Sequence, residues 1–238
     1  MILCLDSGNT RIKWGVHDGS AWLEQGAASQ GDDTALPGLM QRWPMPERIL
    51  LANVAGAGAV AHIRQQLASW APLVREVLST ARCAGVANLY RFPERLGVDR
   101  WCALIGARTL TGDACLVVMA GTATTIDSLD AAGNFLGGLI LPGQELMRRA
   151  LARDTAALPL ADGEWAALPR CTEDAIVTGA IEAQVGAIER AFARLPGEKK
   201  TCLVSGGNAD VLLGRLAIPC AGAQNLPLEG LLRIGRGP

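Results

Sequence analysis

The residues of this chain that can do chemistry gather first at a short glycine turn near the N-terminus. Asp6–Thr10 (DSGNT) follows the apolar run 2–5, and Lys13 lies just beyond it. Glycine allows a tight turn and a close approach to a ligand, and successive N–H groups in such a turn bind phosphate oxygens. An aspartate at a strand end can hold Mg²⁺, usually through water. The segment therefore indicates phosphate binding, with an ordinary hairpin turn as the open alternative.

A second turn repeats the first in the other half of the chain. Gly121-Thr122-Ala123-Thr124 follows the apolar run 115–119, and both halves read strand, turn, strand, turn, strand. This pattern predicts a duplication, with two α/β halves over 1–113 and 114–238 and a cleft between them. Two such turns at matching places fit a polyphosphate that is bound from both sides.

A third segment, Leu96–Trp101, places Asp99 beside Arg100. Phosphoryl transfer to an alcohol needs a group that accepts the hydroxyl proton and a cation that fixes an anionic substrate. These two residues supply both types. The alternative is that Asp99 only favours a helix N-terminus and that Arg100 is solvated.

The elements that must position these residues follow from apolar runs and periodicity. The expected strands are 2–5, 11–16, 48–54, 115–119, 123–127, 135–140 and 201–205. The expected helices are 59–70 (with Val60, Ile63, Leu67 and Trp70 on one face), 99–110, and 172–194 with Thr172 as its capping residue. Residues 152–170 read as a loop. The last helix carries a stripe of small residues, Ala175, Gly179, Ala183 and Ala187, which fits internal packing or a subunit contact.

Composition disfavours several classes of function. Lys plus Arg is 22 and Asp plus Glu is 23 in 238 residues, so the basic excess typical of nucleic-acid binding is missing. No run approaches the ~20 apolar residues of a membrane span. The 7 cysteines include no C-x-x-C pair, so we expect reduced thiols and a cytoplasmic protein. With only His17 and His62, and no G-x-S-x-G, a hydrolase triad is disfavoured.

A dinucleotide-binding pattern is an alternative interpretation of another segment. Gly56–Ala61 matches G-x-G-x-x-A between an expected strand and an expected helix, and Glu76 follows at about the required distance. Such a pattern arises easily in a chain rich in Ala and Gly. A nicotinamide oxidoreductase therefore remains a minor hypothesis, which NAD(H) binding would test.

Four segments taken together resemble the type III pantothenate kinase family, which includes the Bvg accessory factor proteins. They are Asp6–Lys13, Tyr90–Trp101, Ala120–Asp127 and Gly137–Gly143, in order and at matching spacing. The resemblance implies the fold of the acetate and sugar kinase, actin and chaperone ATPase superfamily: an α/β protein of duplicated actin-like ATPase (ribonuclease H-like) domains with an interlobe cleft. It implies ATP-dependent phosphorylation of pantothenate to 4′-phosphopantothenate, the first step of coenzyme A biosynthesis.

The resemblance also implies roles for individual residues. ATP would be bound by Asp6, Ser7, Gly8, Asn9, Thr10, Arg11, Ile12, Lys13, Gly121 and Thr122, with Asp6 organising Mg²⁺ through water and Gly206-Gly207 forming the adenosine-side turn. Pantothenate would be bound by Tyr90, Gly97, Val98, Asp99, Arg100 and Thr172, with Asp99 as the catalytic base and Arg100 near the substrate carboxylate. The family is homodimeric, with the acceptor pocket at the subunit interface.

One residue departs from the family pattern. Met119 stands where the family's D-A-G-T-A motif has an aspartate that binds the required K⁺ or NH₄⁺. A thioether cannot replace a carboxylate for a hard cation. The chain therefore does without the ion, holds it differently or has reduced activity. The retained Asp6, Asp99, Gly121 and Thr122 favour an active kinase with altered ion dependence over a non-catalytic nucleotide-binding regulator.

Overall fold

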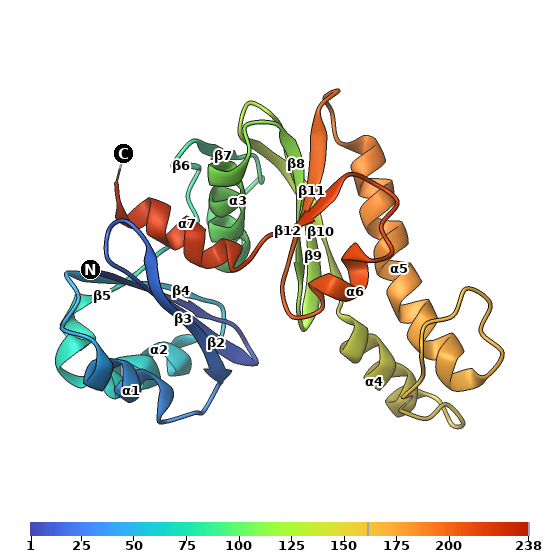
Figure 1. Cartoon of the computed structure of the whole chain (residues 1–238), viewed down its shortest axis with the longest axis horizontal. Coiled ribbons are helices and arrows are strands. Elements are labelled where there is room, and N and C mark those ends of the chain that lie inside the picture. Colours follow the sequence, from blue (N-terminus) through green and yellow to red (C-terminus); the bar gives the residue numbers. More distant parts are fainter. Residues whose placement is uncertain (161, 238) are drawn as a thin grey trace. The chain divides into compact units, whose positions relative to one another are not determined.

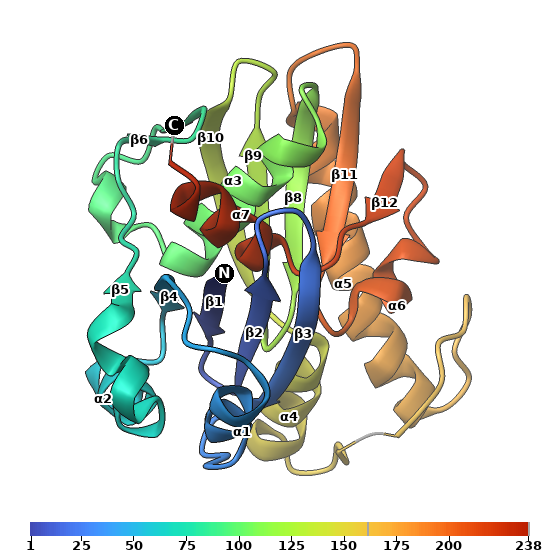
Figure 2. The same ribbon diagram turned by 60° about the vertical axis from the view of Figure 1, so that its left-hand side comes forward.

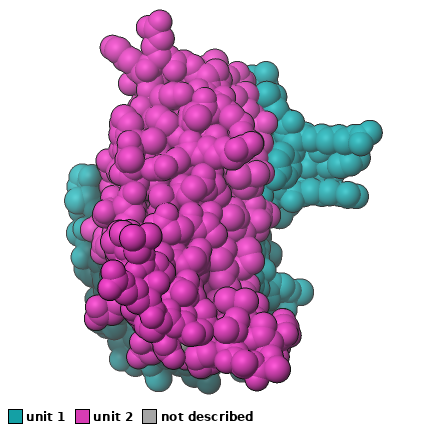
Figure 3. Space-filling model, turned by 90° about the vertical axis from the view of Figure 1, so that its right-hand side faces the viewer, with its two compact units in different colours: residues 1–110, 225–238 teal, residues 111–224 magenta. Residues whose placement is uncertain are grey.

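The computed structural model describes residues 1–160 and 162–237. The chain divides into two compact units (Figure 3), the first formed by Met1–Leu110 with Asn225–Pro238 and the second by Thr111–Gln224. In the described residues, no helix is long and apolar enough to cross a membrane.

Unit 1 is built on a five-stranded sheet in the order β3-β2-β1-β4-β5 (Figure 2). Its strands are β1 (Ile2–Ser7), β2 (Arg11–His17), β3 (Trp22–Ser29), β4 (Arg48–Asn53) and β5 (Val74–Glu76). The first three are antiparallel, whereas β4 is parallel to β1 and β5 is parallel to β4. The remaining elements are α1 (Ala35–Arg42), α2 (Ala57–Gln66), a 3₁₀ helix (Ala68–Leu73), β6 (Arg82–Cys83), β7 (Val86–Asn88), a second 3₁₀ helix (Pro93–Arg95), α3 (Val98–Leu110) and α7 (Leu226–Gly235).

The two faces of β1 bury side chains in different cores, as alternation along a strand requires. Leu3 and Leu5 pack in a core that includes Val60, Ile63 and Trp70 from α2 and the 3₁₀ helix after it. The expected apolar face of 59–70 is confirmed, although the helix changes type after Gln66. On the opposite face, Cys4 packs with Cys102, Leu231 and Leu232 of α3 and α7.

Helix α7 belongs to unit 1 because it packs closely on α3. A Cβ at Gly106 would overlap the Leu226 carbonyl, and a Cβ at Gly230 would overlap the Cys102 carbonyl. Glycine at both positions therefore lets the two backbones approach each other. The expected division into 1–113 and 114–238 differs from these units, because the last 14 residues return to unit 1.

Unit 2 repeats the topology of unit 1, with strands in the order β12-β11-β8-β9-β10 (Figure 2). Its strands are β8 (Ala114–Ala120), β9 (Ala123–Leu129), β10 (Asn134–Pro142), β11 (Lys200–Ser205) and β12 (Cys220–Gly222), and its helices are α4 (Gln144–Asp154), α5 (Thr172–Arg194) and α6 (Ala209–Leu213). Again the first three strands are antiparallel and the last two are parallel. The same order and directions confirm the duplication expected from sequence.

Helix α5 spans the expected residues and covers one face of the unit 2 sheet (Figure 1). Ile181, Val185 and Ile188 pack with Leu116 and Val118 of β8. The small-residue stripe lies elsewhere on the helix: Ala175, Gly179 and Ala183 are exposed and Ala187 is half-buried. Ala175, Gly179 and Ala183 therefore do not serve internal packing, whereas Ala187 packs against the core of unit 2. Thr172 is also not the cap, because Cys171 occupies the N-cap position and makes no side-chain cap bond.

Candidate active site

The turn between β1 and β2 places the expected phosphate-binding residues of unit 1 together. The Gly8 amide donates to the Arg11 carbonyl over 3.0 Å, which closes the turn, and Asp6 lies opposite Lys13 in the β1–β2 register. Asn9, Thr10 and Arg11 are exposed at its tip. Ile12 packs in the core, so only its backbone is available to a ligand.

Gln30 supports this turn from the end of β3. Its Nε2 donates to Ser7 Oγ over 2.8 Å and to the Gly8 carbonyl over 2.7 Å. Ser7 is fully buried, so the hydroxyl holds the turn rather than facing a ligand. Sequence reasoning missed Gln30, because nothing local marks a glutamine as the partner of a turn 22 residues earlier.

Asp6 is buried, with 7% of its surface exposed. Burial raises its pKa to about 6, the positive charge of Lys13 opposes that shift, and the negative charge of Asp99 adds to it. The two expected functional carboxylates of unit 1 therefore lie within electrostatic range of each other. A cation near Asp6 would remove the penalty of the buried charge.

The donor chemistry around Asp6 fits Mg²⁺. Mg²⁺ prefers carboxylate oxygen and usually keeps several waters while binding one or two carboxylates and substrate phosphates. In the described part of the chain, no three His, Cys, Asp or Glu side chains form a group that could hold a metal. Asp6 is therefore suited to an ion that is shared with a nucleotide.

Asp99 lies in the first turn of α3. Its Oδ1 accepts a hydrogen bond from the Arg100 amide over 2.8 Å, and the helix N-terminus favours a negative charge there. A Cβ at Gly97 would lie 2.7 Å from that oxygen, so glycine leaves room for the carboxylate. Val98 packs in the core below.

Arg100 and Tyr90 form a pair beside Asp99. The Arg100 Nη1 donates to the Tyr90 hydroxyl over 3.1 Å, and the guanidinium carbon lies 5.6 Å from the centre of the Tyr90 ring. Arg100 is only 5% exposed, so it is not the solvated cation of the alternative interpretation. The structure thus brings together Asp6, Lys13, Tyr90, Asp99 and Arg100 in unit 1.

The second turn, between β8 and β9, is enclosed by two other glycine turns of unit 2. The Gly121 amide donates to the Ala123 carbonyl over 3.1 Å, and the Gly143 amide donates to the Thr122 carbonyl over 2.8 Å. A Cβ at Gly143 would lie 2.6 Å from the Thr122 carbonyl oxygen. Gly206 has a φ of +107° and touches the Ala120 carbonyl, where a Cβ would overlap. Gly121, Thr122 and Gly206-Gly207 therefore lie at one end of the unit 2 sheet.

Thr172 is exposed at the first residue of α5, in unit 2. Tyr90 and the run Gly97–Arg100 lie in unit 1. The acceptor-binding residues expected from the resemblance therefore come from both compact units.

Met119 lies opposite Thr125 in the β8–β9 register. The Thr125 Oγ1 is buried and has no hydrogen-bond partner among the described residues. One hydroxyl oxygen beside a thioether is a poor set of ligands for K⁺ or NH₄⁺, which prefer several oxygens. These residues do not fit the monovalent cation that the family resemblance implies.

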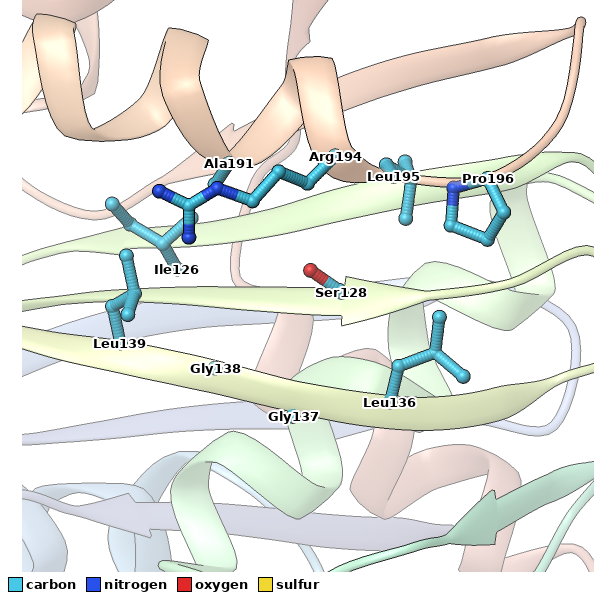
Figure 4. A pocket seen from close by; sticks show the side chains of 10 residues that line it. All are labelled: Ile126, Ser128, Leu136, Gly137, Gly138, Leu139, Ala191, Arg194, Leu195 and Pro196. Atoms are coloured by element: carbon cyan, nitrogen blue, oxygen red, sulfur yellow. The ribbon is translucent and has the colours of Figure 1, made fainter.

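Two other features lie apart from these residues. A pocket of about 230 Å³ in unit 2 (Figure 4) is formed by strands β9 and β10 and the end of α5, and Arg194 extends over its apolar floor. None of the expected site residues lines it.

Glu76 is the carboxylate that the dinucleotide-binding interpretation requires. Its Oε1 lies 3.6 Å from Nη2 of Arg64 in α2, so the carboxylate is already paired.

The chain has the α/β fold that is shared by actin-like ATPases and sugar kinases. A structure from Campylobacter jejuni described as a conserved putative Baf family transcriptional activator is similar over 98% of this chain and 97% of that one, with a TM-score of 0.65 and 21% identity. A putative 2-dehydro-3-deoxygalactonokinase from Sinorhizobium meliloti aligns over 99% and 98% with a TM-score of 0.62 and 16% identity.

Sequence comparison identifies the family within this class. Residues 2–194 match the family described as type III pantothenate kinase. A type III pantothenate kinase of Dechloromonas aromatica (strain RCB) is 62% identical over 98% of both chains. One of Aromatoleum aromaticum is 50% identical over 99% of this chain and 98% of its own. The chain belongs to the type III pantothenate kinase family.

Proposed function

We propose that this chain transfers the γ-phosphoryl group of ATP to the primary hydroxyl of pantothenate. The product is 4′-phosphopantothenate, and the reaction is the first step of coenzyme A biosynthesis. The observation that carries the proposal is the cluster in unit 1, where Asp99 lies within electrostatic range of the buried Asp6 and is followed in the chain by Arg100, which is paired with Tyr90. A base, a cation and a metal-binding carboxylate are the groups that this transfer requires.

The nucleotide is bound by the two glycine turns. In unit 1, the backbone of Gly8–Ile12 and the side chain of Lys13 contact phosphate oxygens, and Asp6 holds Mg²⁺ through water. The bound Mg²⁺ neutralises phosphate charge. In unit 2, Gly121 and Thr122 contact the phosphates, and Gly206-Gly207 contacts the adenosine. The close packing of Gly143 and Gly206 around the second turn supports this assignment, because it fixes the turn before ATP arrives.

The acceptor is oriented by Arg100 and Tyr90 and activated by Asp99. Arg100 binds the pantothenate carboxylate, and its contact with Tyr90 limits the directions in which the guanidinium can point. Asp99 accepts the hydroxyl proton as the oxygen attacks phosphorus. A positioned base contributes about 10²- to 10⁴-fold to the rate, so positioning and charge neutralisation supply the larger share.

The chain acts in the cytoplasm as a homodimer. All seven cysteines are free thiols, which suits a reducing compartment. The exposed stripe of Ala175, Gly179 and Ala183 on α5 gives a second copy a surface for close helix packing. We expect Ala183→Arg to shift the protein towards monomer in sedimentation velocity, whereas Glu198→Arg in an exposed loop leaves the dimer intact. A dimer that survives Ala183→Arg would remove the stripe from the interface.

A coupled assay of ADP release tests the function. We expect release that depends on pantothenate and on Mg²⁺. Nucleotide binding without pantothenate-dependent release would favour the non-catalytic regulator instead, and binding of NAD(H) would favour the oxidoreductase hypothesis.

A further inference from the structure

Two buried polar side chains outside the proposed site hold the loop that carries its acceptor-binding residues. They are Ser79, before β6, and Asn88, the last residue of β7. Their side chains are 7% and 5% exposed. A buried polar group is stable only when it is hydrogen-bonded, so the partners of these two residues show what they fix.

Asn88 uses both ends of its amide within the loop that follows it. Its Oδ1 accepts a hydrogen bond from the Tyr90 amide over 3.1 Å, and its Nδ2 donates to the Pro93 carbonyl over 3.0 Å. The backbone N–H of Asn88 donates to the Ala81 carbonyl over 2.9 Å. The side chain therefore extends from a backbone that is itself held in place. A carboxylate at this position would keep the acceptor and lose the donor.

Ser79 holds the other end of the same loop. Its Oγ donates to the Leu96 carbonyl over 2.8 Å, in a buried position. Leu96 directly precedes Gly97, whose carbonyl accepts the Trp101 amide over 2.9 Å. The residues between these two anchors include Tyr90, which receives the hydrogen bond of Arg100.

We propose that Asn88 and Ser79 are positioning residues for the acceptor pocket. Asn88 acts through Tyr90. Its side chain holds the backbone amide of Tyr90, and the hydroxyl of Tyr90 orients Arg100. Ser79 acts through the backbone that leads into Gly97–Arg100. The proposal rests on the proposed function, since it takes Arg100 and Tyr90 as ligands of an anionic acceptor.

The first test compares steady-state constants of the full-length chain. We expect Asn88→Asp to raise KM for pantothenate about tenfold or more, with kcat and KM for ATP within about twofold, because a displaced ligand weakens ground-state and transition-state binding alike. Ser79→Ala should raise KM for pantothenate and also lower kcat, because the segment that Ser79 holds includes Asp99. Asn134→Ala is the matched control. It also removes an asparagine hydrogen bond in a turn, to Asp130 over 2.9 Å, but in unit 2 and away from the expected site residues. An unchanged KM for pantothenate in folded Asn88→Asp, or an equal rise in KM for ATP, would overturn the proposal.

A double-mutant cycle separates positioning from general stability. Tyr90→Phe removes only the hydroxyl that receives the Arg100 hydrogen bond. If Asn88 acts through that hydroxyl, Asn88→Asp adds little to the KM of the Tyr90→Phe variant, since residues that act together are not additive. Full additivity of the two changes would contradict the coupling.

A spectroscopic readout tests the clamp, by which we mean the hydrogen bonds of Asn88 to Tyr90 and Pro93, even if the wild-type chain fails to phosphorylate pantothenate. Tyr90 is the single tyrosine of the chain, so a sample labelled with ¹³C-tyrosine gives one set of ring signals. We expect these signals to shift or broaden in Asn88→Asp and to stay unchanged in Asn134→Ala. Unchanged signals in Asn88→Asp would reject the clamp, whereas an inactive wild type with shifted signals would reject the proposed function alone.

Discussion

Asp6 shows how one residue can be unfavourable for the folded chain and useful for the reaction. Its carboxylate is buried at the end of β1, and its pKa is raised to about 6, mainly by burial. The folded chain therefore holds a proton there that the unfolded chain, with a pKa of 3.8, has already released. The stability that Asp6 contributes is present below the unfolded pKa and is lost as pH rises through about 6.

Asp6→Asn should therefore stabilise the free chain at neutral and higher pH while abolishing turnover. The shift from 3.8 to about 6 corresponds to at most about 3 kcal/mol in the free energy of unfolding. Denaturant unfolding at about pH 8 and about pH 4 measures it, and the gain should vanish at the lower pH. Asp18→Asn is the control with the opposite sign, because backbone amides lower the pKa of Asp18 to about 2. An equal gain for Asp6→Asn at both pH values would contradict the account.

Met119 is the second residue whose identity matters, because we expect it to determine whether turnover depends on a monovalent cation. Its thioether lies opposite the Thr125 hydroxyl, which has no hydrogen-bond partner in the part of the chain that the structure describes, and it does not supply the oxygen ligands that K⁺ needs. We expect titration of K⁺ or NH₄⁺ against Na⁺ or choline to change kcat/KM by less than about twofold, well under the tenfold that 1.4 kcal/mol of lost cation binding would give. Met119→Asp should introduce a K⁺-dependent increase. Steep activation of the wild-type chain by K⁺ would show that other groups hold the ion.

At the scale of elements, α7 connects the end of the chain to unit 1 through charged and aromatic contacts. Trp22 Nε1 donates to Glu229 over 2.7 Å, and Arg236 Nη2 donates to the Gly19 carbonyl over 2.8 Å. His17 lies among them, 3% exposed, with its Nδ1 accepting the Gly19 amide over 2.8 Å. The other histidine, His62, is partly exposed, and its Nε2 lies 3.0 Å from Asp33 Oδ1.

The position of His17 makes this contact sensitive to acid. Burial and the positive charges of Arg236 and the N-terminus lower the pKa of His17, against the opposing charges of Asp18 and Glu229. Its contribution to stability is present above the unfolded pKa of 6.5 and is lost as pH falls through the lower folded value. Thermal unfolding should show wild type losing its advantage over His17→Gln between about pH 7 and about pH 5. A constant difference across that range would exclude His17 as the cause.

Elements and site differ in how far the sequence predicts them. The seven expected strands, the two glycine turns and the bounds of α5 follow from apolar runs and local turn chemistry, and the structure confirms them. The roles of Gln30, Ser79 and Asn88 do not follow, because each holds a backbone carbonyl 5 to 22 residues away. The return of α7 to unit 1 was also missed, because it depends on Gly106 and Gly230 fitting each other across 124 positions.

In the whole molecule, duplication explains why one short chain carries two glycine turns at matching places, both of which we propose as phosphate-binding turns. Both units use the same strand order and directions, and each has a glycine turn between its first two strands. The two units differ in the residues that accompany the glycine turn. Unit 1 adds Asp99, Arg100 and Tyr90, the residues proposed to bind and activate the acceptor, whereas unit 2 adds Gly143 and Gly206 against its turn.

The role proposed for Asp99 is to accept the proton of the acceptor hydroxyl, and the turnover of Asp99→Asn measures that role. The amide keeps the size of the side chain and cannot act as a base. We expect pantothenate-dependent ADP release to fall about 10²- to 10⁴-fold, while calorimetry shows ATP and pantothenate binding within a few-fold of wild type. Near-normal turnover of Asp99→Asn would contradict the assignment.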